Sequence, residues 1–155
     1  TILREVVEAA AILKTDFDVD ADVWSATSFN ELRRDGLITS RWNMLHPEET
    51  PRQSFVEECL EGAKGPVVAS TDYMKSYADQ IREFISGTYT VLGTDGFGRS
   101  DTRERLRHFF EVDRYFIVVA ALTALVEDNV VDVGQVAAAI KKFGIDPEKV
   151  NPALS

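Results

Sequence analysis

A glycine-rich stretch, Gly93–Asp101, holds the residues best placed to bind a ligand, because it lies between a predicted strand and a predicted helix. The stretch contains three glycines, Gly93, Gly96 and Gly98. Backbone N–H groups at such a position and the dipole of the following helix attract anions. Arg99 would attract a phosphate, whereas Asp95 and Asp101 would repel it. The spacing matches neither the dinucleotide fingerprint nor a P-loop. The glycines are therefore also explained by left-handed backbone and by packing of Phe97 against a neighbour.

Three alternating carboxylates near the start of the chain are spaced like the first ligands of a calcium loop. They are Asp16, Asp18 and Asp20. Such a loop requires glycine at its sixth position and a bidentate glutamate at its twelfth, but Ala21 and Thr27 stand there. The pattern therefore predicts a solvated strand face rather than a metal site.

The histidines and the single cysteine are the remaining candidates for catalysis. His46 stands at a predicted helix end, where an imidazole satisfies free carbonyls, and His108 lies within a predicted helix. Neither belongs to a metal or triad motif of known spacing. A pairing of Cys59 with either histidine stays open, although an isolated helical cysteine is usually a small buried hydrophobe. We assign no catalytic, cofactor-binding or metal-binding residue.

Two arginine-rich segments, residues 31–35 and 99–107, interleave acids with bases. Such segments are typical of ion-paired helix surfaces, where each exposed pair contributes about 0–1 kcal/mol. Arginine together with aromatic residues is also the composition of interface hot spots. The residues that we name as interface or anion-loop candidates are Asp95, Phe97, Arg99, Asp101 and Arg103.

Apolar periodicity and capping residues predict the elements that would position these side chains. Apolar residues at helical spacing predict a first helix from Ile2 to Leu13, and a second helix is expected to weaken at Gly36. The further N-caps that we predict are Ser28, Thr50, Asp72, Asp101, Asp113 and Asp132. Strict alternation predicts a strand over residues 16–24, and apolar runs between turn signals predict strands over 67–69 and 88–92.

Strands separated by helices require crossover connections, so we predict an α/β fold with a sheet covered on both faces, in three layers. With 155 residues, 45% of them hydrophobic and 28% charged, the chain fits a single domain over residues 1–155. The helical pattern begins at Ile2 and the strands are few. We therefore expect a fragment whose first strand or strands precede Thr1.

Composition excludes several classes of function. The formal net charge is −9, which argues against binding the phosphate backbone of a nucleic acid. The longest apolar run, residues 116–126, is far short of the roughly 20 residues that a membrane span needs. The sequence has no secretory signal pattern, and one cysteine forms no internal disulfide.

Longer blocks of sequence resemble the carboxy-terminal domain of the homodimeric, bacterial-type pyruvate dehydrogenase, the thiamine-diphosphate-dependent decarboxylase component of its complex. The blocks are Ala21–Gly36, Arg41–Pro47, Ala69–Lys75, Val91–Asp101 and Asp146–Pro152. Phe109 stands where we expect a second histidine in some relatives, so a role that depends on a histidine pair there would not transfer.

The resemblance implies a transketolase carboxy-terminal-like domain with a mixed sheet flanked by helices. Members of the family decarboxylate pyruvate and pass the acetyl group to a lipoyl group. In them, thiamine diphosphate, Mg²⁺ and the catalytic histidines lie in preceding domains, so we expect no cofactor on this segment and an inactive isolated domain. The implied partners are the rest of the polypeptide, the second subunit of a homodimer and the dihydrolipoyl acetyltransferase core, in the cytoplasm.

Two functional hypotheses follow. The first is a non-catalytic domain that supports the dimer of a larger pyruvate dehydrogenase. The alternative is an autonomous α/β module that binds a small anion or a regulator through Gly93–Asp101.

Overall fold

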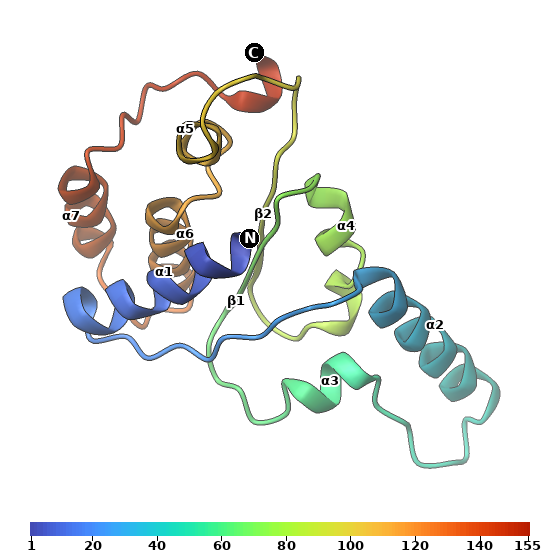
Figure 1. Cartoon of the computed structure of the whole chain (residues 1–155). Coiled ribbons are helices and arrows are strands. Elements are labelled where there is room, and N and C mark those ends of the chain that lie inside the picture. The colour runs from blue at the N-terminus through green and yellow to red at the C-terminus, as the bar shows by residue number, and fades with distance from the viewer.

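The computed structural model describes residues 1–155 as helices packed on both faces of a small sheet (Figure 1). The helices are α1 (Ile2–Phe17), α2 (Phe29–Leu45), α3 (Phe55–Cys59), α4 (Lys75–Asp79), α5 (Arg103–Phe109), α6 (Arg114–Glu127) and α7 (Val133–Phe143). The strands are β1 (Val67–Ser70) and β2 (Tyr89–Leu92), and the 3-10 turns are η1 (Arg82–Phe84) and η2 (Pro152–Leu154). Helices α1, α6 and α7 lie on one side of the strands, and α2, α3 and α4 lie on the other. The predicted α/β class and its three layers are confirmed.

The two strands pair in parallel, with Val67 opposite Tyr89 and Ser70 opposite Leu92. A parallel pair requires a crossover, which α4 and η1 provide. Two of the three predicted strands are thereby confirmed. The resemblance implies a mixed sheet, and of that sheet residues 1–155 contain this one parallel pair. Because both strands point the same way, the loops after them meet at one edge of the sheet.

The larger core lies between α1, α6 and α7. Helix α6 is apolar on every side because it packs against both strands, α1 and α7. The buried members of this core are Ala9, Leu13, Ile117, Val118, Leu122 and Ala139. Full burial of each valine, leucine or isoleucine contributes about 1.5–3 kcal/mol.

A second core lies on the other face of the sheet. Its buried members are Val56, Ile81, Phe84 and Tyr89. The Tyr89 hydroxyl donates a hydrogen bond of 2.8 Å to the carbonyl oxygen of Ala78, which satisfies the one polar atom of this ring. Burial raises the pKa of Tyr89 to about 12.

The strand predicted over residues 16–24 is wrong. Helix α1 continues through Phe17 and ends at Asp18, which is left-handed with φ 53° and whose N–H donates to the carbonyl of Leu13. Phe17 then packs edge-on against Phe143 of α7, with ring centroids 6.4 Å apart. The acidic residues that follow have no neighbouring strand with which to form backbone hydrogen bonds. They alternate with apolar residues along an exposed segment after the helix end, and this segment is not a strand.

The second predicted helix is not weakened at Gly36, because α2 runs unbroken from residue 29 to residue 45. Gly36 is buried, and a Cβ at this position would collide with the ring of Phe84. The absence of a side chain therefore lets α2 approach η1 closely and pack over the second core.

Three predicted helix starts are displaced. Helix α3 begins after Ser54 rather than Thr50, α4 after Met74 rather than Asp72, and α5 after Thr102 rather than Asp101. The confirmed N-caps are Ser28, Asp113 and Asp132. Helices α3 and α5 begin at another capping residue nearby, Ser54 and Thr102, whereas Met74 makes no side-chain cap at the start of α4. The carboxylate of Asp72 binds an arginine of α5 instead of a helix N-terminus.

We predict that Gly36→Ala lowers the free energy of unfolding by about 1–3 kcal/mol, because overpacking against Phe84 outweighs the roughly 1 kcal/mol gained in helix propensity. Urea unfolding monitored by circular dichroism measures the change. Gly65→Ala is the matched control, since a Cβ there meets nothing within 4 Å. A more stable Gly36→Ala variant would show that the close approach does not matter.

Candidate functional site

The Gly93–Asp101 loop leaves the carboxyl end of β2 beside the residues that follow β1. The left-handed backbone predicted for this loop is present at Gly96, with φ +108°. A Cβ on Gly96 would collide with the carbonyl oxygen of Pro152, so the loop is held against η2. Ligands of open α/β sheets bind at this carboxyl edge.

The packing predicted for Phe97 is wrong, because its side chain is 79% exposed. The two residues before Phe97 are both engaged elsewhere. Gly96 is held against η2, and the carboxylate of Asp95 accepts the N–H of Lys75 at 3.0 Å. Phe97 is therefore available for contact with another surface, while Asp95 is engaged with the start of α4.

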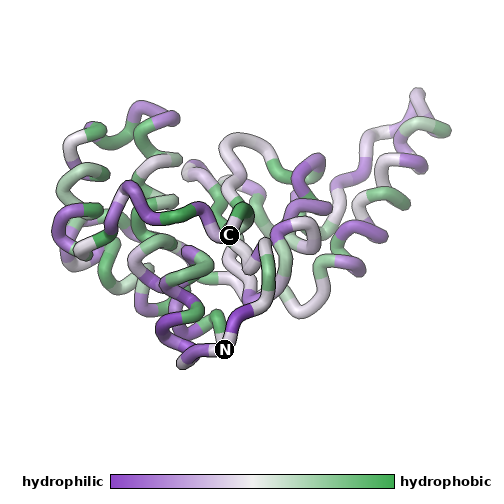
Figure 2. Tube along the Cα trace, turned by 90° about the horizontal axis from the view of Figure 1, so that it is seen from above, coloured by the Kyte–Doolittle hydropathy of each residue, from purple (hydrophilic) through white to green (hydrophobic).

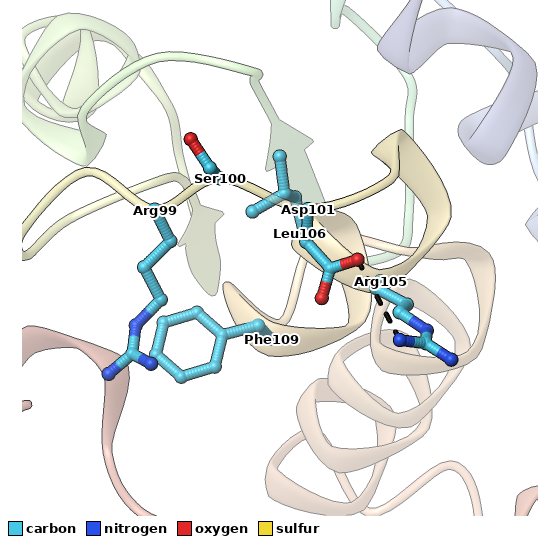
Figure 3. A pocket seen from close by; sticks show the side chains of 6 residues that line it. All are labelled: Arg99, Ser100, Asp101, Arg105, Leu106 and Phe109. Carbon is cyan, nitrogen blue, oxygen red and sulfur yellow. Dashed lines mark ion pairs between the residues drawn. The ribbon is translucent and has the colours of Figure 1, made fainter.

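A depression of about 300 Å³, open to solvent, separates the loop from α5. Its lining residues are Arg99, Ser100, Asp101, Arg105, Leu106 and Phe109 (Figure 3). The guanidinium of Arg99 lies over the Phe109 ring, 4.1 Å from its centroid. Arg105 Nη1 lies 3.9 Å from Asp101 Oδ1, which is a weak ion pair.

A second depression of about 480 Å³ adjoins the first and shares Arg99, Asp101 and Leu106 with it. Its charged lining residues are Asp72, Arg99, Asp101, Arg103 and Arg107. The structure therefore brings together three of the residues named from the sequence, Arg99, Asp101 and Arg103. Asp95 and Phe97 line neither depression.

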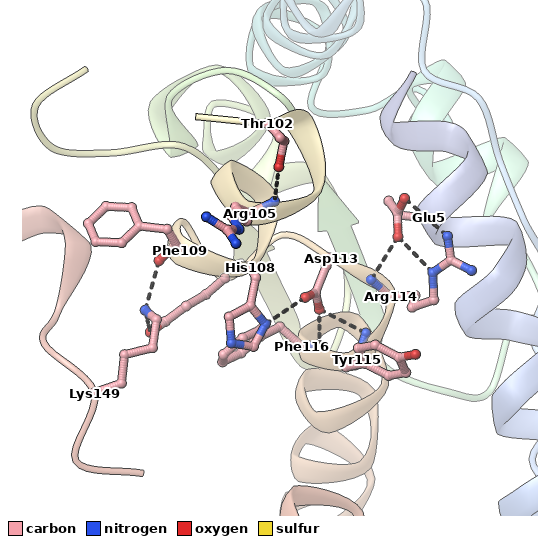
Figure 4. A network of polar contacts seen from close by, with 11 residues as sticks. Glu5, Thr102, Arg105, His108, Phe109, Asp113, Arg114, Tyr115, Phe116 and Lys149 are labelled. Carbon is pink, nitrogen blue, oxygen red and sulfur yellow. Dashed lines mark hydrogen bonds and ion pairs between the residues drawn. The ribbon is translucent and has the colours of Figure 1, made fainter. Parts of the chain in front are cut away.

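A buried ion network lies behind this site and joins α1, α5 and α6 to Asp72, the second residue after β1. Arg107 is only 8% exposed, so its assignment to an ion-paired helix surface is wrong. It donates to Asp72 at 2.8 Å and to Glu5 at 3.2 Å. Arg114 binds the same glutamate from the start of α6, with Nε 2.9 Å from Glu5 Oε2 (Figure 4).

The arginines control the ionisation of Glu5. Burial alone would raise the pKa of this carboxyl group, but hydrogen bonds from Arg114 and the charges of Arg114 and Arg107 hold it below its usual value of 4.5. Glu5 is therefore a buried anion stabilised by two cations. Its contribution to stability is present above about pH 4.5 and is lost as the pH falls through the lower pKa of the folded state.

Reasoning from the sequence missed this network, although the first helix carries a signal for it. Glu5 precedes Ala9 and Leu13 at intervals of four, so it lies on the buried stripe of α1. A charge on such a stripe requires a buried partner. The sequence could have shown that a partner exists, but not that it stands about a hundred residues away.

Both histidines make local contacts. His46 Nδ1 lies 2.8 Å from the carbonyl oxygen of Trp42, as predicted for a helix end. His108 Nδ1 lies 2.9 Å from Asp113, whose other oxygen accepts the N–H groups of Tyr115 and Phe116 at the start of α6 (Figure 4).

Cys59, which is partly buried, hydrogen-bonds to neither histidine. No group of three or more His, Cys, Asp or Glu residues could hold a metal ion. None of the helices has the length and apolar character required to cross a bilayer.

The fold and sequence together define the family. Residues 1–113 match the model of the transketolase-like TK C-terminal domain. The chain belongs to this family, and its two parallel strands between helix layers are a part of such an α/β domain.

Individual relatives of the chain point to one kind of protein within this family. The chain is 64% identical over 98% of its length to the pyruvate dehydrogenase E1 component of Pseudomonas aeruginosa, 57% over 98% to that of Cupriavidus necator and 56% over 100% to that of Escherichia coli K12. In each case it spans 17% of the relative's length. The resemblance to pyruvate dehydrogenase stated from the sequence is confirmed.

We predict that Glu5→Gln lowers the free energy of unfolding by about 3 kcal/mol at pH 7, because two buried guanidinium groups lose their anion. The difference from the parent chain should shrink as the pH falls below about 4.5, because the pKa of Glu5 is lower in the folded state than in the unfolded state. Chemical denaturation across this pH range measures both effects. Glu8→Gln is the control, since Glu8 is exposed and lies 3.4 Å from Arg114, so the expected loss is below about 1 kcal/mol. A difference that is the same at pH 3 and pH 7 would contradict the role of Glu5 as a buried anion.

Proposed function

We propose that the chain is the carboxy-terminal domain of a pyruvate dehydrogenase E1 component, within a longer polypeptide. The observation that carries this proposal is 64% identity over 98% of the chain to such a component. The full enzyme would decarboxylate pyruvate with thiamine diphosphate and Mg²⁺ and transfer the acetyl group to the lipoyl group of the dihydrolipoyl acetyltransferase core, in the cytoplasm. This chain would form one domain, residues 1–155.

The domain's own role in this proposal is structural and supports a dimer. Two of its buried charged groups, Glu5 and Arg107, are paired with each other, which is typical of groups that hold elements together. His108 is engaged with the cap of α6 in the same way. The thiamine diphosphate and the reacting groups would then lie in other domains, as the resemblance implies.

Exposed apolar residues favour contact with other parts of the enzyme. Helix α2, on the right in Figure 1, extends away from the larger core and carries hydrophobic residues along its length (Figure 2). Its exposed large apolar side chains are Leu37, Ile38, Met44 and Leu45, and Phe55 of α3 is exposed nearby. Several exposed apolar side chains on one helix favour a protein interface, and Phe97 offers a second such contact.

The proposal predicts that the isolated chain does not turn over pyruvate. Thiamine diphosphate, Mg²⁺, pyruvate and an artificial electron acceptor are supplied in a spectrophotometric assay, and the full-length polypeptide that carries this sequence serves as the positive control. Turnover by the isolated chain would contradict the non-catalytic role. Absence of pyruvate turnover by the full-length polypeptide would contradict the assignment to pyruvate dehydrogenase.

We predict that Phe97→Ser in the full-length polypeptide weakens dimer association at least tenfold, because an exposed aromatic side chain loses its contact with the second subunit. Sedimentation velocity over a concentration series measures the dissociation constant. Val133→Ser is the control, since Val133 is 66% exposed but lies on α7, away from the loop. Equal association of the Phe97 variant and the parent would exclude Phe97 from the dimer interface.

A further inference from the structure

We propose that the two adjoining depressions beside α5 form a binding site for a small phosphate-bearing ligand. We call this the arginine site, and its cationic residues are Arg99, Arg103, Arg105 and Arg107. The proposal goes beyond the structural role of the domain and does not depend on it.

The first observation is the position of the site. It is bounded by Asp72 after β1, by Thr94 to Asp101 after β2 and by α5. The carboxyl ends of two parallel strands thus open into one depression, where α/β sheets bind ligands. The two volumes, about 300 and 480 Å³, lie within the range of small-molecule sites.

The second observation is local charge. Four arginines line the two depressions and only two carboxylates do, Asp72 and Asp101, in a chain whose net charge is −9. Asp72 is neutralised by Arg107, with which it forms a hydrogen bond of 2.8 Å. The remaining lining is positive, against the sign of the molecule as a whole.

The third observation is that the outer guanidinium groups retain free donors. Arg99 and Arg103 form no ion pair, and the nearest carboxylate oxygen to Arg105 is 3.9 Å away. Arg99 Nη2 donates one long hydrogen bond of 3.4 Å to Ser155 Oγ, which leaves its other N–H groups free. The ring of Phe109 lies under Arg99 and restricts its orientation, so less freedom is lost when it binds. Planar guanidinium groups donate paired hydrogen bonds to phosphate oxygens.

The acidic residues of the loop do not oppose an anion as strongly as the sequence indicates. The carboxylate of Asp95 accepts the N–H of Lys75 and lines neither depression. Asp101 accepts the N–H of Thr102 at 2.7 Å and has Arg105 as its neighbour. Gly98 lines the second depression, and no atom lies within 4 Å of where its Cβ would be, so a ligand can approach the backbone there.

The loop can bind the ligand and contact another surface at the same time. Phe97 lines neither depression and is exposed, whereas Arg99 faces α5. A ligand between the loop and α5 would therefore fix the segment that carries Phe97. The arginine site is in this way placed to couple an anionic metabolite to the contacts of the domain.

The test is isothermal titration of inorganic pyrophosphate into the full-length polypeptide that carries this sequence. The polypeptide is first loaded with thiamine diphosphate and the unbound excess is removed, so that a diphosphate site in another domain is filled and no free diphosphate competes for the arginine site. The double variant Arg99→Ala/Arg103→Ala should lose binding at least tenfold, since two charge-assisted donors are removed. The matched control is Arg33→Ala/Arg41→Ala, which removes two exposed, unpaired arginines of α2 and should bind like the parent.

Each outcome of the titration either supports or overturns the proposal. Equal binding by the parent and the Arg99/Arg103 variant, or no binding by either, would overturn the proposal. An equal loss in both double variants would show that net charge, not this site, attracts the anion. Citrate bound as tightly as pyrophosphate would exclude selectivity for phosphate. Pyruvate turnover is measured on the same samples, so a failure of the site is distinguished from a failure of the proposed function.

Discussion

A single carboxylate, Glu5, joins the two halves of the chain. It lies between Arg107 and Arg114, which come from two different helices, and Arg107 also binds Asp72 after β1. Desolvation of these charges offsets much of their attraction, and well-packed apolar residues could be equally stable. The main effect of the network is therefore on how the helices are arranged relative to one another. A buried carboxylate is tolerated only where both guanidinium groups reach it, which fixes how α1, α5 and α6 meet.

This constraint extends to the candidate site. Arg103 and Arg107 stand four residues apart on α5 and so lie on one face of the helix. Because Arg107 is held by Glu5 and Asp72, the same face of α5 is oriented toward the loop after β2. The anchoring residue is buried and the outer arginine is exposed. A buried ion pair thus positions exposed cations on the same helix.

Local patterns in the sequence identify most elements but not their partners. The strands at 67–70 and 89–92 and the caps Asp113 and Asp132 follow from short-range chemistry, and the sequence predicts them. The alternation over 16–24 fails because a strand also needs a neighbour, which no local pattern supplies. Of the five site candidates that the sequence offers, Arg99, Asp101 and Arg103 line the two depressions, whereas Asp95 and Phe97 do not. The sequence favours a surface position for Arg107, because its partners are 35 and 102 residues away along the chain.

Two glycines also show that local sequence patterns do not identify distant partners. Helix propensity alone makes Gly36 a weak point, yet it lies where α2 passes over the ring of Phe84. Gly96 likewise serves a close approach to η2, which exposes the neighbouring Phe97. In both places a missing side chain is explained by an element distant in sequence. The exposed faces of α2 and of the loop after β2 therefore follow from how closely the backbone packs beneath them.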